Sequence, residues 1–275
     1  SRPEPVQGQP GKTKWVLMHS PAPYMQYFVG EFDGQSFTNE NSAAKIYRPD
    51  YGPDYYAAIT YNDLPARQQP VSIGWINNWK YANDIPTTPW KSAMSIPRKL
   101  SVKKIDNEWI LMQQPVDEIK LLRGKLNSWK NIQVPVLYQL PATGQVMEME
   151  ILFAPSNDGN SGIRLAVGEG LFIEIGYDGK KGQLYIDRSK AGDKEFNKAF
   201  AGLYRSAVSL VNRSGKLSLH IFFDKSIIEV FANDGEVVMT AQLFPVEKNN
   251  GIQLFNTGKL VFFESINFWP LKSVW

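Results

Sequence analysis

The chain has 275 residues, of which 43% are hydrophobic and 21% are charged, and its formal net charge is +3. This composition is typical of a globular protein with a sizeable core, and so weak a charge does not favour nucleic acid or an anionic membrane surface as a partner. The chain has no cysteine and only two histidines, His19 and His220, so disulfides and thiol chemistry are excluded, and neither a His-based metal site nor a Ser-His-Asp triad is expected. No apolar run approaches ~18 residues, so we expect no membrane span.

The first part of the chain, residues 1–112, predicts short strands and no convincing helix. After a loop rich in Pro, Gly, Gln and Lys, apolar runs bounded by turn residues indicate the strands. We expect them at residues 14–18, 26–30, 55–61, 71–75, 92–96, 100–104 and 108–112. This spacing favours an antiparallel, sequentially wound system such as a sandwich or a propeller. A propeller blade has about four strands, so this part supplies about two blades, too few to close a ring.

Residues 113–126 have a different pattern. After Pro115, a short stretch has acidic residues in its first turn and a basic residue near its end, and Gly124 follows that stretch. This order predicts a short helical segment, and we interpret 113–126 as a linker between two domains.

The remainder, residues 127–275, alternates apolar runs with Gly, Asn and Asp turns. Strands are expected at residues 146–153, 163–167, 171–177, 183–187, 217–224, 226–232, 237–243, 251–256 and 259–268. So many strands with little helix predict a complete β-sandwich. The fold class is therefore all-β.

The densest aromatic stretch is residues 73–81, which carries Trp75 and Trp79 and is followed by Trp90. The sequence has no Gly-rich loop before a helix and no metal-ligand spacing, so no cofactor and no metal is expected. Aromatic residues beside carboxylates and amides remain. Flat rings can stack on the faces of neutral sugars while polar side chains bond to their hydroxyls, so a sugar is the ligand class that this stretch favours.

Several strings along the chain resemble glycoside hydrolase family 32, the β-fructosidases, which include invertases, inulinases and levanases. These strings are YFVGEFDG at 27–34, DYGPDYYAA at 50–58, GWINNWKY at 74–81 and FFDKSIIEVFANDG at 222–235. They occur in the family's order and cover nearly the whole chain. The resemblance implies the last two blades of a five-bladed β-propeller followed by a complete β-sandwich.

The resemblance also implies retaining hydrolysis of β-fructosidic bonds or fructosyl transfer, which needs a carboxylate nucleophile and a carboxylic acid ~5–5.5 Å apart. The family's three carboxylate motifs, of the Asn-Asp-Pro, Arg-Asp-Pro and Glu-Cys-Pro types, are absent here and would precede Ser1. Glu4 does not sit in such a motif. We therefore expect no catalytic residue in this chain, which would be the C-terminal part of a levanase-like enzyme and inactive alone. A non-catalytic fructan-binding or assembly module is the alternative.

By the same resemblance, the substrate-binding candidates are Asp50, Tyr56 and Trp75. Trp75 would stack on a fructosyl ring and Asp50 would bond a sugar hydroxyl, although a packing Trp and a solvated loop carboxylate are open alternatives. Trp79 and Trp90 are expected to pack. The expected partners are a fructan or fructo-oligosaccharide, and either the missing N-terminal propeller half or a second copy of the chain. The chain itself does not fix the compartment, and the resemblance implies a secreted, periplasmic or cell-surface protein.

Overall fold

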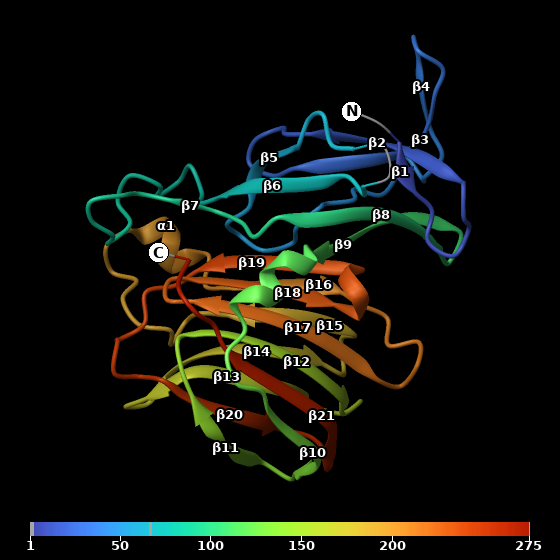
Figure 1. Cartoon of the computed structure of the whole chain (residues 1–275). Helices are drawn as coiled ribbons and strands as arrows, with labels where there is room; N and C mark the ends of the chain where they lie inside the picture. The colour runs from blue at the N-terminus through green and yellow to red at the C-terminus, as the bar shows by residue number, and fades with distance from the viewer. Residues whose placement is uncertain (1–2, 66–67, 275) are drawn as a thin grey trace.

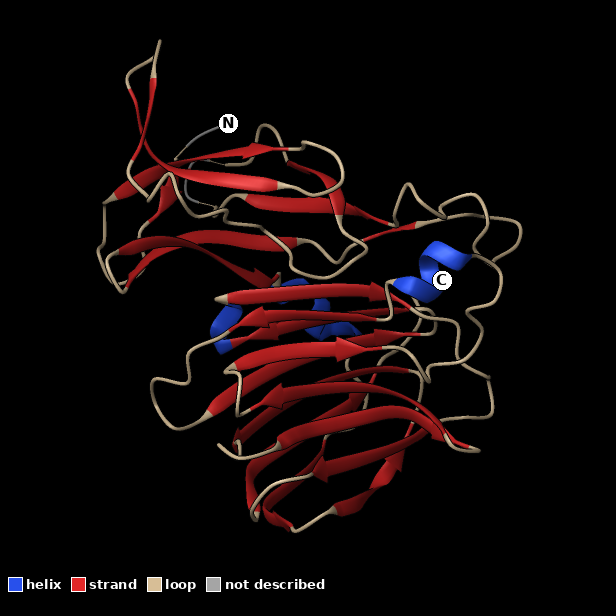
Figure 2. Ribbon diagram, turned by 180° about the vertical axis from the view of Figure 1, so that it is seen from behind, coloured by secondary structure: helices blue, strands red, loops and turns tan. Residues whose placement is uncertain are grey.

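The computed structural model describes residues 3–65 and 68–274. Figure 1 shows two N-terminal sheets lying against the edge of a larger, two-sheet sandwich. Seen from behind in Figure 2, the short helical segments of the described chain lie at the junction between these two parts. The prediction of an all-β fold is confirmed. None of the described helices is long and apolar enough to cross a membrane.

The N-terminal part consists of two antiparallel sheets that do not close into a ring. The first has the order β1 (Glu4–Pro5), β2 (Thr13–His19), β3 (Gln26–Phe32) and β4 (Phe37–Asn39). The second has the order β5 (Tyr56–Thr60), β6 (Val71–Ile76), β8 (Arg98–Ile105) and β9 (Glu108–Pro115), with β7 (Ala93–Met94) paired to β6. The second sheet lies between the first sheet and the sandwich (Figure 1). The sequence missed β1 and β4, which are too short to show a periodic pattern.

A 3₁₀ helix, η1 (Asp117–Leu122), follows β9 and confirms the short helical segment predicted there. Its first turn carries Asp117 and Glu118, and Lys120 lies in its last turn, so the charges complement the helix dipole. The chain then enters the sandwich at Arg123, whose backbone bridges to Leu271 near the C-terminus.

The sandwich is built from two antiparallel sheets. One has the order β10 (Asn127–Val134), β21 (Val261–Pro270), β12 (Val146–Ala154), β17 (Leu217–Asp224), β18 (Ile227–Ala232) and β19 (Val237–Gln242). The other has the order β11 (Leu137–Thr143), β20 (Gly251–Asn256), β13 (Asn160–Gly168), β14 (Leu171–Asp178), β15 (Gln183–Asp187) and β16 (Arg205–Ser209). Helix α1 (Lys198–Gly202) and the 3₁₀ turn η2 (Asn233–Gly235) lie in connections.

The two sheets of the sandwich enclose one continuous apolar core. Alternate residues of β12, such as Met147, Met149 and Ile151, point inward and are buried. Phe153 and Phe263 stack across neighbouring strands with ring centroids 4.8 Å apart. This alternation is the pattern from which the strands were predicted. The edge strands β10, β11 and β16 were not predicted, because they bury few side chains and so lack a clear apolar alternation.

Two buried arginines join the N-terminal sheets to the sandwich. Arg98, on β8, donates to Asp50 at 3.0 Å and reaches across the interface to Glu229 at 2.6 Å and Thr240 at 2.8 Å. Its side chain is fully buried, and burial opposes its charge, but the nearby carboxylates outweigh this and raise its pKa. Gly52 allows the close approach, since a Cβ there would lie 1.9 Å from the Thr240 carbonyl oxygen.

The second arginine, Arg188, comes from the sandwich and reaches in the opposite direction. Its guanidinium donates to Asp54 at 2.7 Å and to the Tyr81 hydroxyl at 3.1 Å, and that hydroxyl in turn donates to Asp54. The ring of Phe200 packs 3.8 Å from the guanidinium carbon. These two networks fix the second sheet on the sandwich.

Candidate functional site

A row of large side chains crosses the second N-terminal sheet. Tyr56 on β5 is directly opposite Trp75 on β6, and Trp75 is directly opposite Met94 on β7. Directly opposed residues of antiparallel strands share one face, so the three side chains lie side by side. Trp79 extends the row, with its ring centroid 4.8 Å from that of Trp75. We call Tyr56, Trp75, Met94 and Trp79 the aromatic row.

The aromatic row is open to solvent. Met94 is 52% exposed and Trp79 is 71% exposed, while Tyr56 and Trp75 are half-buried. The Tyr56 hydroxyl donates to the carbonyl of Ser20 at 2.7 Å, which fixes the ring. Exposed aromatic side chains of this kind can pack against a flat ligand.

The local sequence explains why the row projects outward. The backbone of β5 is irregular after Tyr56, where Ala57 has a positive φ of 50° and the register shifts. On β6, Gly74 leaves space for the ring of Tyr55, which a Cβ would approach to 2.4 Å. Tyr55 is therefore buried, and the centroid of its ring lies 4.1 Å from the guanidinium carbon of Arg98.

Two buried amides hold the loop that follows β6. Asn77 donates to the Ser92 hydroxyl at 2.8 Å, and Asn78 donates to the Pro53 carbonyl at 2.8 Å. Tyr81 is then buried in the Arg188 network, so the loop is fixed on both sides of Trp79. The prediction that Trp79 and Trp90 pack is wrong, since Trp79 contacts the Trp75 ring but stays largely exposed and Trp90 is 66% exposed. Sequence reasoning did not identify Met94, whose place depends on strand pairing.

The predicted site residues separate into two locations. Tyr56 and Trp75 meet in the aromatic row, but Asp50 lies in the interface with the sandwich and is 6% exposed. Its carboxylate accepts hydrogen bonds from the backbone of Gly52 at 2.9 Å, from the Thr240 amide at 2.9 Å and hydroxyl at 2.6 Å, and from Arg98 at 3.0 Å. The geometry gives no support to a sugar contact by Asp50, which stays a prediction.

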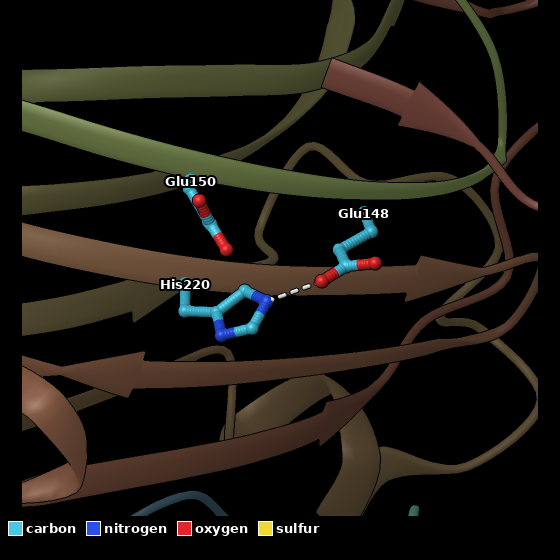
Figure 3. Close-up of side chains that lie close together, drawn as sticks. All are labelled: Glu148, Glu150 and His220. Atoms are coloured by element: carbon cyan, nitrogen blue, oxygen red, sulfur yellow. Dashed lines mark hydrogen bonds and ion pairs between the residues drawn. The ribbon is translucent and has the colours of Figure 1, made fainter. Parts of the chain in front are cut away.

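A second group of polar side chains, which the sequence did not reveal, lies on the sandwich (Figure 3). Glu148 and Glu150 on β12 and His220 on β17 place potential ligand atoms within 4.8 Å of one another. Among the described residues, this is the group whose donor atoms could surround a metal ion. We call it the Glu-Glu-His cluster. His220 is 70 residues from Glu150 and 72 from Glu148 in sequence, so only strand pairing brings it to the two glutamates.

The two carboxylates of the Glu-Glu-His cluster do not form a hydrolytic pair. The Glu148 side chain is fully buried, and Arg123 binds both of its oxygens, at 2.5 and 2.7 Å. Glu150 projects from the same face of β12 as Glu148. The two carboxyl groups of a glycosidase instead flank the scissile bond. This arrangement suits cation binding better than attack on a sugar.

Family models match both parts of the chain. The glycosyl hydrolases family 32 N-terminal domain matches residues 4–115, and the family 32 C-terminal domain matches residues 118–270. The chain belongs to glycosyl hydrolase family 32. The resemblance found in the sequence is thereby confirmed.

Characterised members of family 32 match nearly the whole chain. It is 39% identical to a levanase of Bacillus subtilis over 98% of this chain and 42% of that protein. It is 34% identical to an extracellular exo-inulinase of Aspergillus niger over 96% of this chain and 52% of that protein. The chain thus spans about half the length of the family 32 relatives that it matches.

Solved family 32 structures share the fold. The crystal structure of exo-inulinase from Aspergillus awamori superposes with a TM-score of 0.89 at 32% identity, covering 100% of this chain and 56% of that one. A β-fructofuranosidase of Schwanniomyces occidentalis complexed with fructosyl-erythritol gives a TM-score of 0.82 at 26% identity, covering 99% of this chain and 59% of that one.

Proposed function

We propose that this family 32 chain is the C-terminal part of a retaining β-fructosidase of the levanase type, and that the aromatic row is one wall of its fructosyl-binding site. In this proposal residues 1–112 are the last two blades of the propeller, 113–126 the linker and 127–275 the sandwich. The observation that carries it is the aromatic row, exposed on a sheet whose sequence matches the N-terminal domain model of the family.

We further propose that the chain alone does not cleave β-fructosidic bonds. Retaining cleavage needs two free carboxyl groups facing each other across the substrate. Asp50 and Asp54, on the loop before β5, are buried and ion-paired with arginines, and Glu148 is held by Arg123. The catalytic carboxylates would come from propeller strands outside this sequence, which agrees with the greater length of the relatives.

The proposed partners follow from the same surfaces. A fructan or fructo-oligosaccharide would bind the aromatic row. Strand β5 is an edge of its sheet, and its Ile59 is 66% exposed beside Tyr61 at 43%, so further propeller strands or a second copy of the chain would cover it. Light scattering of the chain alone should then show self-association, and a monomer at high concentration would contradict this partner.

A fructan-binding module without catalysis is the second candidate. The observation that favours it is Trp79, whose ring is 71% exposed and held in place beside Trp75. By resemblance to family members, some of which are named extracellular, we propose a secreted or cell-surface location for either candidate.

Titration calorimetry with fructo-oligosaccharides tests the sugar-binding proposal. Trp75→Ala should weaken binding about tenfold, as expected for the loss of one stacked ring worth about 1.5 kcal/mol. Trp90→Ala is the control, because Trp90 is a tryptophan that is 66% exposed and lies outside the row. Equal affinities for the wild type and Trp75→Ala would contradict the proposed site.

A further inference from the structure

We propose that the Glu-Glu-His cluster is a binding site for a divalent transition-metal ion such as Zn²⁺. Nothing in the sugar-binding proposal uses these residues. They lie on the face of β12 and β17 that points away from the sandwich core, in a different sheet from the aromatic row.

The scaffold of the proposed site is rigid. Glu148 and Glu150 are two residues apart on β12 and therefore point to the same side of the sheet. His220 lies directly opposite Glu150 on β17, so all three side chains rise from one face of a two-strand ladder in the middle of the sheet. Sites on strands hold their geometry better than sites on loops.

The donor set fits a borderline cation. It offers one imidazole nitrogen and two carboxylate groups, both of which are zinc donors, and open zinc sites combine three protein ligands with water. The His220 Nε2 already lies 2.6 Å from Glu148 Oε1, so the ring nitrogen faces the carboxylates. Zn²⁺ binds such donors at about 2.0–2.2 Å, so two ligands of one tetrahedral ion lie about 3.4 Å apart. On binding, His220 and Glu148 would give up their hydrogen bond and move slightly apart, while donors now up to 4.8 Å apart would move inward. Glu150, with 43% of its side chain exposed, is free to make that movement.

The surroundings provide room and charge. The cluster lines a cavity of about 460 Å³ whose walls include η1 and the η2 turn, which leaves space for the ion's water ligands. Burial acts to raise the pKa of Glu148, but the hydrogen bonds from Arg123 and His220 outweigh it and lower that pKa, so the carboxylate stays charged. Arg123 would remain on Glu148 as an outer partner that orients it, and Trp269 packs 3.8 Å from the guanidinium.

Arg123 also limits the affinity. Its Nη2 lies 3.1 Å from Glu150 Oε1, so it competes with the metal for the negative charge of the two carboxylates. Replacing Arg123 by Gln should therefore have two opposite effects. It removes the ion pair with Glu148, which lowers the stability of the metal-free chain, but it should raise the affinity for the metal ion.

The experiment is a titration of the intact chain with ZnCl₂, followed by calorimetry and by thermal unfolding. Wild type should bind one equivalent, and His220→Gln and Glu150→Gln should each weaken binding tenfold or more. His19→Gln is the matched control, because His19 is the other histidine of the chain and lies exposed on β2.

Arg123→Gln should bind Zn²⁺ more tightly than wild type and regain melting temperature when Zn²⁺ is added. MgCl₂ and CaCl₂ at equal concentration should not displace Zn²⁺, since hard cations prefer oxygen ligands.

Three results would overturn the proposal: no saturable Zn²⁺ binding, binding that survives His220→Gln in a folded variant, or equal losses in His19→Gln and His220→Gln. If a variant fails to fold, imidazole NMR signals of the wild type decide the question, because the chain has two histidines. Zn²⁺ should shift the His220 signals and leave those of His19 in place, and the reverse pattern would contradict the site.

Discussion

The sandwich and the N-terminal sheets bury their apolar side chains in different ways. The sandwich has one continuous core that includes side chains from both of its sheets. The N-terminal sheets have two small clusters instead, one around Val29, Leu100 and Val102 and one around Met25 and Tyr55. Small cores contribute little stability by themselves, so the N-terminal sheets depend on what they contact.

The contact with the sandwich is polar and buried. Arg98 reaches from the N-terminal sheets to Glu229, and Arg188 reaches from the sandwich to Asp54. Such ion pairs position one part on the other, but they are costly to break because each leaves a buried charge without a partner. The comparison shows a sandwich built around its own core and two sheets that are anchored to it by two arginines.

Removing Arg98 should have the largest effect. Arg98→Ala leaves Asp50 and Glu229 buried and uncompensated, so we expect a loss of about 3–5 kcal/mol in the free energy of unfolding, measured with urea. Arg213→Ala is the control, since Arg213 pairs with Asp106 and Glu236 at the surface and should cost less than about 1 kcal/mol. Similar losses in both variants would refute the anchoring role of Arg98.

A matched pair of leucines compares the two cores directly. Leu100 in the N-terminal sheets and Leu165 in the sandwich are both fully buried. Leu→Ala replacements cost about 2–5 kcal/mol, depending on how well the site collapses. We expect about 3–4 kcal/mol at Leu165 and about 2–3 kcal/mol at Leu100, again by urea unfolding. A larger loss of stability at Leu100 than at Leu165 would contradict the view that the sandwich has the stronger core.

Loss of one hydroxyl group from the Arg188 network should lower the free energy of unfolding by less than these changes. Tyr81→Phe keeps the ring against Phe200 but removes the oxygen that bonds both Asp54 and Arg188. We expect a loss of about 1–3 kcal/mol, because buried polar partners are left unsatisfied. A double-mutant cycle with Phe200→Leu checks that the ring contact is unchanged, and no loss in Tyr81→Phe would show that the hydroxyl is dispensable.

The smallest expected effect is a pH dependence at η1. Hydrogen bonds from Lys120 and Lys99 lower the pKa of Asp117 to about 2. A lowered pKa in the folded state stabilises the fold above the ordinary value of 3.8, and this contribution is lost as the pH falls from about 4 to about 2. Asp117 is exposed, so solvent screening keeps the effect to a few tenths of a kcal/mol.

Comparing wild type with Asp117→Asn across this pH range isolates that contribution. The difference in urea midpoint should shrink as the pH approaches 2, and it should also shrink in high salt. A difference that is constant with pH would mean that the lysine contacts do not set the pKa of Asp117.

The sequence predicted much of the fold, because alternating apolar residues identify strands that bury one face. It predicted less of the sites. Trp75 and Tyr56 were identified through a family string, but Met94 and Trp79 join them only through strand pairing and a loop held by two asparagines. Side-chain contacts between distant segments, such as Asp50 with Thr240 or Glu150 with His220, leave no periodic signal in one sequence.

Fructose release from levan, inulin and sucrose by the purified chain tests the central claim most directly. This family 32 chain carries an exposed aromatic wall, while its carboxylates Asp50, Asp54 and Glu148 are held by arginines. We predict no release above a buffer control. Release that copurifies with the chain would contradict the account, since it would require a pair of free carboxyl groups within these residues.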